Sequence, residues 1–236
     1  MSFTSIKWLR WLAITLPLMT GVCSSLSAAE SAVAIPTAVV DNPKTEASLQ
    51  TAVLAGGCFW GVQGVFEHVR GVHKVISGYS GGEKSTAEYE RVSGGRTGHA
   101  ESVQISFDPQ EVSFGELLRV YFSVAHNPTE LNRQGPDTGT QYRSVIFYAD
   151  ESQKNIAEAY IAQLNKSEAF SSAILTRVDP LKEFYPAEDY HQDFLINNPR
   201  HPYIVMNDLP KIKNLESILP EYYQGTPVTV GSINSR

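Results

Sequence analysis

The apolar and polar positions of this chain predict strands and helices in an irregular order. An apolar run from Thr51 ends in Gly56-Gly57, and apolar residues then recur at helical spacing up to Val69. Further strands are expected at residues 72–79, 99–107, 144–149 and 173–178. Helices are expected at residues 113–125, 150–166 and 186–197. Because these elements are interleaved without strict alternation, the pattern favours an α+β fold, a compact mixed β-sheet with helices packed on it.

The turn after the first strand places a cysteine at the start of a helix. Cys58 follows Gly56-Gly57 directly and is itself followed by the aromatic residues Phe59 and Trp60. Most free cysteines are small buried hydrophobes. The unpaired N–H groups and positive partial charge of a helix N-terminus, however, favour a thiolate over a thiol. The position therefore favours a reactive cysteine.

The N-terminal region has the layout of a secretory signal peptide. Lys7 and Arg10 precede an apolar run that is too short for a comfortable membrane span, and mostly small residues follow up to Ala29. We expect a signal peptide at residues 1–29, cleaved after Ala28 or Ala29, and hence an exported protein, periplasmic or secreted. A lipoprotein signal acylated at Cys23 and an uncleaved membrane anchor are less favoured alternatives.

The rest of the chain divides into three parts by composition. Residues 30–50 are rich in Ala, Pro, Thr and Ser and predict a flexible leader. Residues 51–224 predict one catalytic domain, and residues 225–236 a C-terminal tail. The formal net charge of −6, with no basic cluster, argues against a nucleic-acid partner. Lys211 and Lys213 are expected on a solvated helix face.

The cysteine count is informative. The chain contains only Cys23 and Cys58, and the first lies within the predicted signal peptide. The mature protein would therefore carry a single thiol and no internal disulfide. A lone thiol in an oxidising compartment is unusual enough to suggest a function.

A carboxylate lies on an apolar strand face. In the strand predicted at residues 99–107, Glu101 shares a face with Val103, Ile105 and Phe107. Burial disfavours the charged form of a carboxyl, so its pKa should rise and the group should donate a proton near neutral pH. The alternative is that Glu101, near the start of the strand, turns to solvent. A reactive thiolate beside a protonated acid would suit the reduction of an oxygen-bearing atom.

Five short motifs resemble one enzyme family. They are Gly56-Gly-Cys-Phe-Trp-Gly61, Gly78-Tyr-Ser-Gly-Gly82, Thr97-Gly-His-Ala-Glu101, Gly139-Thr-Gln-Tyr-Arg-Ser144 and Tyr190-His-Gln-Asp193. Together and in this order they resemble the peptide methionine sulfoxide reductase A family, from Thr51 to about Tyr203. The resemblance implies a two-layer sandwich with a ferredoxin-like core and the reduction of methionine S-sulfoxide, free and in proteins, as repair of oxidative damage.

The resemblance also implies roles for individual residues. Cys58 would attack the sulfoxide sulfur as a thiolate and become a sulfenic acid. Glu101, with the phenols of Tyr89 and Tyr142, would bind the sulfoxide oxygen and supply the proton that lets it leave as water. Asp137 would order the site and influence the protonation of the cysteine. Phe59 and Trp60 would form the apolar pocket for the substrate methyl group, and His191 would support the site.

One departure from the family pattern concerns recycling. Many members carry further cysteines in a glycine-containing C-terminal tail, whereas residues 214–236 contain none and Ser93 stands where some relatives have cysteine. The sulfenic acid should therefore be reduced from outside, by a thioredoxin-like protein or a small thiol. We expect no cofactor, no metal and a monomer. Histidines 68, 73, 126 and 201 are expected to be structural or on the surface.

Two other functional classes remain open from the sequence. A cysteine hydrolase or acyltransferase could use Cys58 as its nucleophile, but it would need a general base beside the sulfur, normally a histidine. A non-catalytic module could capture oxidised methionine in partner proteins without recycling.

Overall fold

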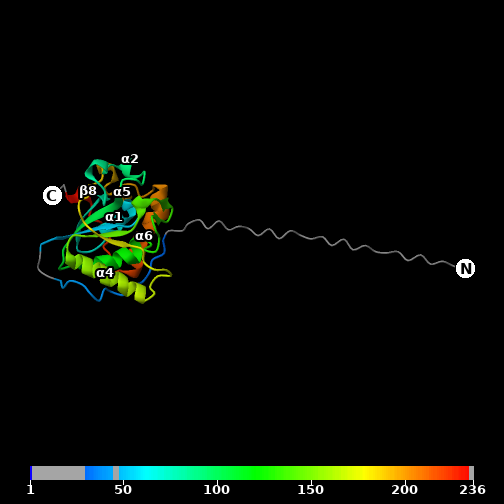
Figure 1. Cartoon of the computed structure of the whole chain (residues 1–236), viewed down its shortest axis with the longest axis horizontal. Helices are drawn as coiled ribbons and strands as arrows, with labels where there is room; N and C mark the ends of the chain where they lie inside the picture. The colour runs from blue at the N-terminus through cyan, green and yellow to red at the C-terminus, as the bar shows by residue number, and fades with distance from the viewer. Residues whose placement is uncertain (2–29, 45–47, 234–236) are drawn as a thin grey trace.

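The fold is built on a six-stranded mixed sheet in a computed structural model that describes Met1, residues 30–44 and residues 48–233 (Figure 1). The predicted signal peptide and Cys23 lie outside these residues. The strands, in the order β7-β6-β1-β3-β2-β8, are Arg177–Pro180, Val145–Tyr148, Gln50–Ala55, Ala100–Phe107, Val72–Ser80 and Phe184–Pro186. Only the β6–β7 pair is parallel within this sheet.

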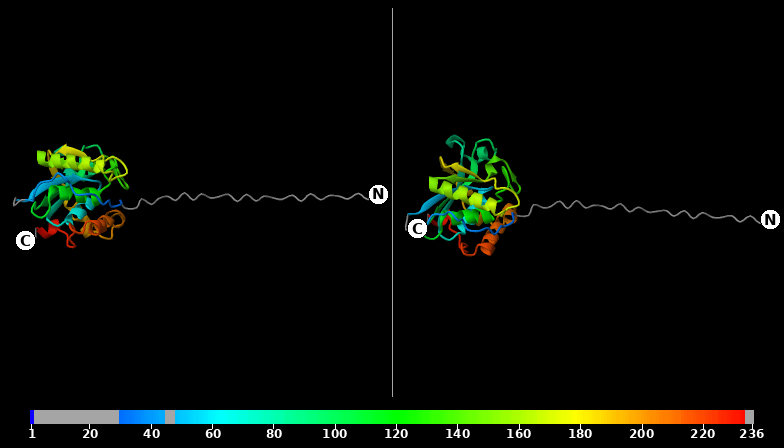
Figure 2. Two further views of the ribbon diagram at one scale, coloured as in Figure 1. Left: turned by 90° about the horizontal axis from the view of Figure 1, so that it is seen from below. Right: turned by 60° about the horizontal axis from the view of Figure 1, so that its bottom comes forward.

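Helices cover one face of the sheet. The α-helices are α1 Phe59–Glu67, α2 Tyr89–Val92, α3 Phe114–Val120, α4 Glu151–Lys166, α5 Phe194–Asn197, α6 Leu209–Ile218 and α7 Val230–Ile233. Shorter turns of 3₁₀-helix (η1 Lys84–Thr86, η3 Thr140–Tyr142, η4 Asp189–His191) and π-helix (η2 Tyr121–Ala125, η5 Ile204–Asp208) connect them, and β4 Arg133–Gln134 pairs with β5 Asp137–Thr138. Residues from about 204 onward (orange to red) lie together at one side of the domain (Figure 2).

The order of elements confirms the expected fold class. The succession β1-α1-β2-β3-α3-β6, with spatial order β6-β1-β3-β2, is the ferredoxin-like arrangement. The main core joins the apolar residues of α1, α3 and α4 to one sheet face, through residues such as Leu54, Phe66 and Ile105. A smaller cluster around Val53, Val145 and Phe147 lies on the other face. Among the described residues, no helix has the length and apolar character needed to cross a membrane.

Two expected helix starts are confirmed in detail. The hydroxyl of Ser113 accepts a hydrogen bond from the Glu116 N–H, and the Glu116 carboxylate accepts one from the Ser113 N–H, so α3 begins with a capping box. Asp150 caps α4 by accepting from the N–H of Gln153. Local signals of this kind are readable because they involve neighbours in sequence.

The helix expected at residues 186–197 is wrong. Pro186 ends β8, which pairs with β2, and only Phe194–Asn197 form an α-helical turn after the 3₁₀ turn at residues 189–191. The side-chain amide of Gln192 bonds both the N–H and the carbonyl of Ser77 in β2, and Asp193 has a positive φ of 52°. Tertiary hydrogen bonds therefore replace helical ones here. The strand expected at residues 173–178 begins only at Arg177.

Residues 30–41 pack on the domain, in contrast to the flexible leader expected at residues 30–50. Ile35 is buried in the main core. The carbonyl of Pro36 accepts a hydrogen bond from the Tyr160 hydroxyl of α4, and Asp41 accepts from Ser113 and Gly115 at the start of α3. The segment (blue) accordingly runs beside the helical layer in Figure 1. Its apolar residues follow neither a helical nor a strand period, so the pattern alone did not reveal this packing.

Lys211 also differs from expectation, because it is buried rather than on a solvated helix face. It lies on the inner side of α6, a helix for which the sequence pattern gave no bounds, whereas Lys213 is exposed as expected. The C-terminal residues return to the domain as well. The Val228 N–H donates to the carbonyl of Glu67, and the Val230 N–H donates to the side chain of Asp193.

Candidate active site

Cys58 stands at the end of β1, as the N-cap of α1. The chain reaches it through Gly57, whose φ is +90°, and a Cβ on this glycine would approach the side chain of Gln134 to 2.7 Å. A side chain here would be both strained and obstructed, so the tight turn requires glycine. Cys58 is partly buried and is the free cysteine among the described residues.

Glu101 lies beside the first turn of the same helix. Its side chain is buried on β3, as are Val103, Ile105 and Phe107 of the same face. One carboxylate oxygen accepts a hydrogen bond from the N–H of Phe59 over 3.1 Å. Burial raises the pKa of Glu101 to about 8, with the Phe59 N–H opposing the rise and Asp137 adding to it. The expected raised pKa is therefore present, and the side chain does not turn to solvent.

The resting protonation of Cys58 differs from the expectation drawn from its place at a helix start. Burial is the main cause that raises the pKa of the thiol well above its ordinary value, and the charges of Glu101 and Asp208 raise it further. A backbone hydrogen bond from Trp60 acts in the opposite direction, as expected of a helix N-terminus. In this environment desolvation outweighs the helix start, so the resting form is the neutral thiol.

Tyr89 and Tyr142 lie within the electrostatic range of Cys58 and Glu101. Burial raises the pKa of Tyr89 and Tyr142, and the charges of both Glu101 and Cys58 contribute to each shift. Both phenols therefore remain protonated and can donate hydrogen bonds to an oxygen held between them. Tyr89 begins α2 and is fixed there because its N–H donates to a carboxylate oxygen of Glu188 over 2.9 Å.

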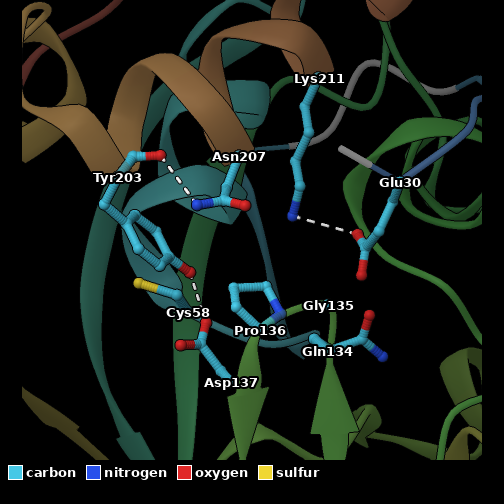
Figure 3. Close-up of a pocket in the computed structure, with 9 residues that line it drawn as sticks. All are labelled: Glu30, Cys58, Gln134, Gly135, Pro136, Asp137, Tyr203, Asn207 and Lys211. Carbon is cyan, nitrogen blue, oxygen red and sulfur yellow. Dashed lines mark hydrogen bonds and ion pairs between the residues drawn. The ribbon is translucent and has the colours of Figure 1, made fainter. Parts of the chain in front are cut away.

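Asp137 forms a pair with a tyrosine that the sequence analysis missed. The hydroxyl of Tyr203 donates to the carboxylate of Asp137 (Figure 3). Burial raises the pKa of Asp137, and the Tyr203 bond and Lys211 oppose this rise. The charge of Cys58 acts in turn on Tyr203. Tyr203 lies just before η5, in a stretch without strand or helix periodicity, so only its place at the end of the matched motifs marked it.

The two aromatics after Cys58 are placed differently from each other. Trp60 is half-buried, and its indole stacks on Phe194 with ring centroids 3.8 Å apart. The indole N–H donates to Nδ1 of His191 over 3.1 Å. Phe59 is 1% exposed, and its ring packs against the rings of Tyr79 and His191. It is therefore part of the buried packing next to Cys58. His191 thus supports both aromatic residues.

A small pocket with a cavity volume of about 20 Å³ opens at the sulfur. Figure 3 shows Cys58, Asp137 and Tyr203 toward one side of it and Lys211 and Glu30 toward the other. The remaining lining residues are Gln134, Gly135, Pro136 and Asn207. Glu30, Asn207 and Lys211 were not expected at the site. They come from the segment expected to be a flexible leader, from η5 and from α6, respectively.

The structure thus brings Cys58, Glu101, Tyr89, Tyr142 and Asp137 into one site with Phe59 and Trp60 beside it. The assembly offers a thiol, a neutral carboxylic acid and phenol donors around one sulfur atom. The ring nitrogens of the buried histidines His68 and His126 bond to carbonyls of their own helices. The acid is therefore the proton-transfer group next to the thiol, which favours reduction of an oxygen-bearing substrate over acyl transfer.

Comparisons with known proteins agree with this chemistry. A family model described as "Peptide methionine sulfoxide reductase" matches residues 50–222. The peptide methionine sulfoxide reductase MsrA 2 of Mesorhizobium japonicum is 58% identical over 194 residues, covering 82% of this chain and 100% of that protein. The MsrA 2 of Synechocystis is 57% identical over 182 residues, covering 76% and 85%.

Solved structures show the same relationship. The reduced form of Mxr1 from Saccharomyces cerevisiae is 34% identical, with a TM-score of 0.59, covering 67% of this chain and 91% of that one. Methionine sulfoxide reductase A of Corynebacterium diphtheriae is 35% identical, with a TM-score of 0.57, covering 70% and 82%.

Proposed function

Because the chain belongs to the peptide methionine sulfoxide reductase family, we propose that it reduces methionine S-sulfoxide, free and in proteins, at Cys58. The observation that carries this proposal is the pairing of the Cys58 thiol with the buried acid Glu101, which bonds to the residue next to that cysteine. The biological consequence is repair of oxidised proteins.

The first step reduces the sulfoxide and oxidises Cys58 by two electrons. The Cys58 sulfur bonds to the substrate sulfur, while the thiol proton and the Glu101 proton go to the oxygen, which leaves as water. Tyr89 and Tyr142 donate hydrogen bonds to this oxygen as the S–O bond weakens. Attack of water on the Cys58 sulfur then releases methionine, leaves a sulfenic acid and returns a proton to Glu101. Trp60 borders the space for the substrate methyl group, above the buried ring of Phe59.

The second step restores the thiol from outside. A thiol attacks the Cys58 sulfenic acid, forms a mixed disulfide and releases water. A second thiol then attacks the disulfide, frees Cys58 and leaves the reductant as a disulfide. We propose a thioredoxin-like protein or a small thiol as the reductant, since residues 59–236 contain no second cysteine.

The site of action follows from the N-terminal sequence. The charged, apolar and small segments of residues 1–29 support an exported protein, periplasmic or secreted. We propose in addition that it acts as a monomer. Fractionation of cells that express the full chain, with mass spectrometry of its N-terminus, tests this proposal. Recovery of uncleaved protein in the membrane would contradict it. Light scattering of the mature protein tests the oligomeric state.

Incubation with the separate sulfoxide epimers and dithiothreitol tests the activity. The protein from Ala29 onward should reduce the S-epimer and leave the R-epimer unchanged. A Cys58→Ser variant of the same protein is the matched control and should reduce neither. Stoichiometric binding of oxidised methionine without turnover would instead support a capture module. Hydrolysis of an ester or thioester substrate would support a cysteine hydrolase.

A further inference from the structure

The pocket at Cys58 has a second, charged end that the proposed reaction does not use. Lys211 enters it from α6, and Glu30 approaches from the N-terminal segment (Figure 3). The Lys211 ammonium lies 3.3 Å from a carboxylate oxygen of Glu30 and donates a hydrogen bond of 2.9 Å to the carbonyl of Ala125. Only 7% of the Lys211 side chain and 15% of the Glu30 side chain are exposed. Lysine side chains are almost never buried unless they are paired, because removing the charge from water is costly.

The ammonium remains charged. Burial by itself would lower the pKa of Lys211, but Glu30, Asp208 and Cys58 raise it above its ordinary value. An ammonium that is stabilised by a negative charge on Cys58 must itself stabilise that negative charge to the same degree, because the interaction is mutual. Lys211 therefore brings a positive charge into the pocket that Cys58 also lines.

The other charged groups in this part of the site are acidic. Asp208 is buried, and its carboxylate packs on Gly61 in the first turn of α1, where a Cβ would overlap it. One Asp208 oxygen has no hydrogen-bond donor, and the Glu30 oxygens have none beyond the ion pair with Lys211. Asp137, and Glu101 once it ionises above neutral pH, raise the pKa of the Cys58 thiol further. Asp208, Glu101 and Asp137 disfavour the thiolate when they are charged. Among the residues that line the pocket, Lys211 carries the positive charge.

We propose that Lys211 is a positioning residue that favours the reactive thiolate of Cys58, and that Glu30 restrains this effect through its ion pair with the ammonium. The inference deepens the proposed function, since it concerns the nucleophile of that reaction. It also assigns a functional effect to the N-terminal segment, because Glu30 belongs to that segment and pairs with Lys211. The Cys58 thiol should be neutral at rest and should ionise readily when it attacks. The Lys211 ammonium favours the ionised form, and its ion pair with Glu30 limits that effect.

Alkylation of Cys58 by iodoacetamide across the pH range tests the proposal without any sulfoxide. In the protein from Ala29 onward Cys58 is the sole cysteine, so the rate of alkylation reports its thiolate fraction. Lys211→Met should lower the rate at pH 8 by roughly three- to tenfold, since a shift of one pKa unit changes the thiolate fraction about tenfold. Glu30→Gln should raise it by a similar factor. Lys211→Arg should stay close to wild type.

The double variant and the surface controls make the test specific. If Glu30 acts through Lys211, Glu30→Gln should have no further effect in the Lys211→Met protein. Lys213→Met and Glu216→Gln change exposed charges on the same helix and should leave the pH profile unchanged. Equal profiles for Lys211→Met and Lys213→Met would overturn the proposal, as would a Glu30→Gln effect that persists without Lys211. Circular dichroism confirms that each variant is folded.

Sulfoxide turnover with dithiothreitol is measured separately on the same proteins. A protein that shows the expected alkylation profiles but no turnover would contradict the proposed function and leave this inference standing. If the wild-type protein turns over sulfoxide but the alkylation profile of Lys211→Met equals that of wild type, the proposed function stands and this inference is wrong.

Discussion

The carboxylate of Glu101 accepts a hydrogen bond from the backbone N–H of Phe59, 3.1 Å away. Phe59 is the first residue of α1 and directly follows Cys58, so this bond fixes the acid of β3 against the helix that the cysteine begins. The hydrogen bond opposes the effect of burial without cancelling it, and the pKa of Glu101 stays raised to about 8. The acid is thus protonated at neutral pH within reach of the reacting sulfur.

Substitution of Glu101 should affect chemistry far more than binding. Glu101→Gln keeps the shape and an oxygen acceptor for the Phe59 N–H but loses the acidic proton. The first step should slow by roughly 10²–10⁴-fold, the usual range for general acid catalysis. Single-turnover quench measurements of methionine formation check this, with the exposed Glu158→Gln on α4 as the matched control. A rate within a few-fold of wild type would rule out the acid role.

The rate of the first step should fall at alkaline pH. Because the pKa of Glu101 is about 8, the protonated acid is lost above that pH, and with it the proton for the leaving oxygen. Single-turnover rates from pH 6 to pH 10 should show this descending limb. The limb should be missing in Glu101→Gln, which has no proton to lose. Its persistence in the variant would assign the limb to another group.

Stability should depend on the same titration. A carboxyl whose pKa rises from 4.5 to about 8 on folding binds its proton more tightly in the native state. Native stability is therefore lost as the pH rises between these values, by an amount on the order of a few kcal/mol. Glu101→Gln should raise Tm at pH 9 and leave it nearly unchanged at pH 4. Calorimetry with Glu158→Gln in parallel checks this sign, and an equal shift at both pH values would contradict it.

The oxidised enzyme should hold a stable sulfenic acid. One equivalent of substrate, without reductant, should add one oxygen atom to Cys58 of the protein from Ala29 onward. A sulfenic-selective reagent should then add one label per chain, because no second cysteine is present to capture it. Mass spectrometry reads both additions, and Cys58→Ser is the control. Loss of two hydrogens in a protein that retains Cys23 would show a resolving thiol and contradict external recycling.

The packing of the N-terminal segment can be tested through stability. Ile35 is 3% exposed and belongs to the main core, so Ile35→Ala should lower the free energy of unfolding by about 2–4 kcal/mol. Val39 is 84% exposed in the same segment, and Val39→Ala should change it by less than about 0.5 kcal/mol. Urea titrations of both variants decide the point. Equal stabilities would show that the segment does not dock in solution.

The sequence predicted the parts of the fold that depend on local signals. The Gly56-Gly57 turn, the apolar spacing of α1 and the start of α3 after Ser113 all depend on near neighbours in the chain, and each was found where expected. The same holds for Glu101, whose burial follows from the alternation along β3. Tyr89, Tyr142 and Asp137 were named only through the family resemblance, because an isolated tyrosine or aspartate carries no periodic signal.

The features that the sequence did not predict depend on long-range contacts. Gln192 bonds to Ser77 across 115 positions and prevents the expected C-terminal helix. Lys211 and Glu30 meet in the pocket although neither has a local partner that marks it as buried. The raised pKa of Cys58 likewise depends first on burial of the thiol and then on carboxylates from distant elements, neither of which a helix start alone reveals.

Trp60, whose indole stacks on Phe194, can report on the site through its intrinsic fluorescence. In the chain from Ala29 onward, Trp60 is the sole tryptophan in the sequence, so all indole fluorescence comes from the residue beside the reactive cysteine. Its indole N–H bonds to His191, and burial lowers the pKa of that imidazole, which leaves the ring neutral at pH 7 and unable to quench as a cation. Emission can therefore follow substrate arrival, oxidation of the sulfur and docking of a reductant in real time, without any attached dye.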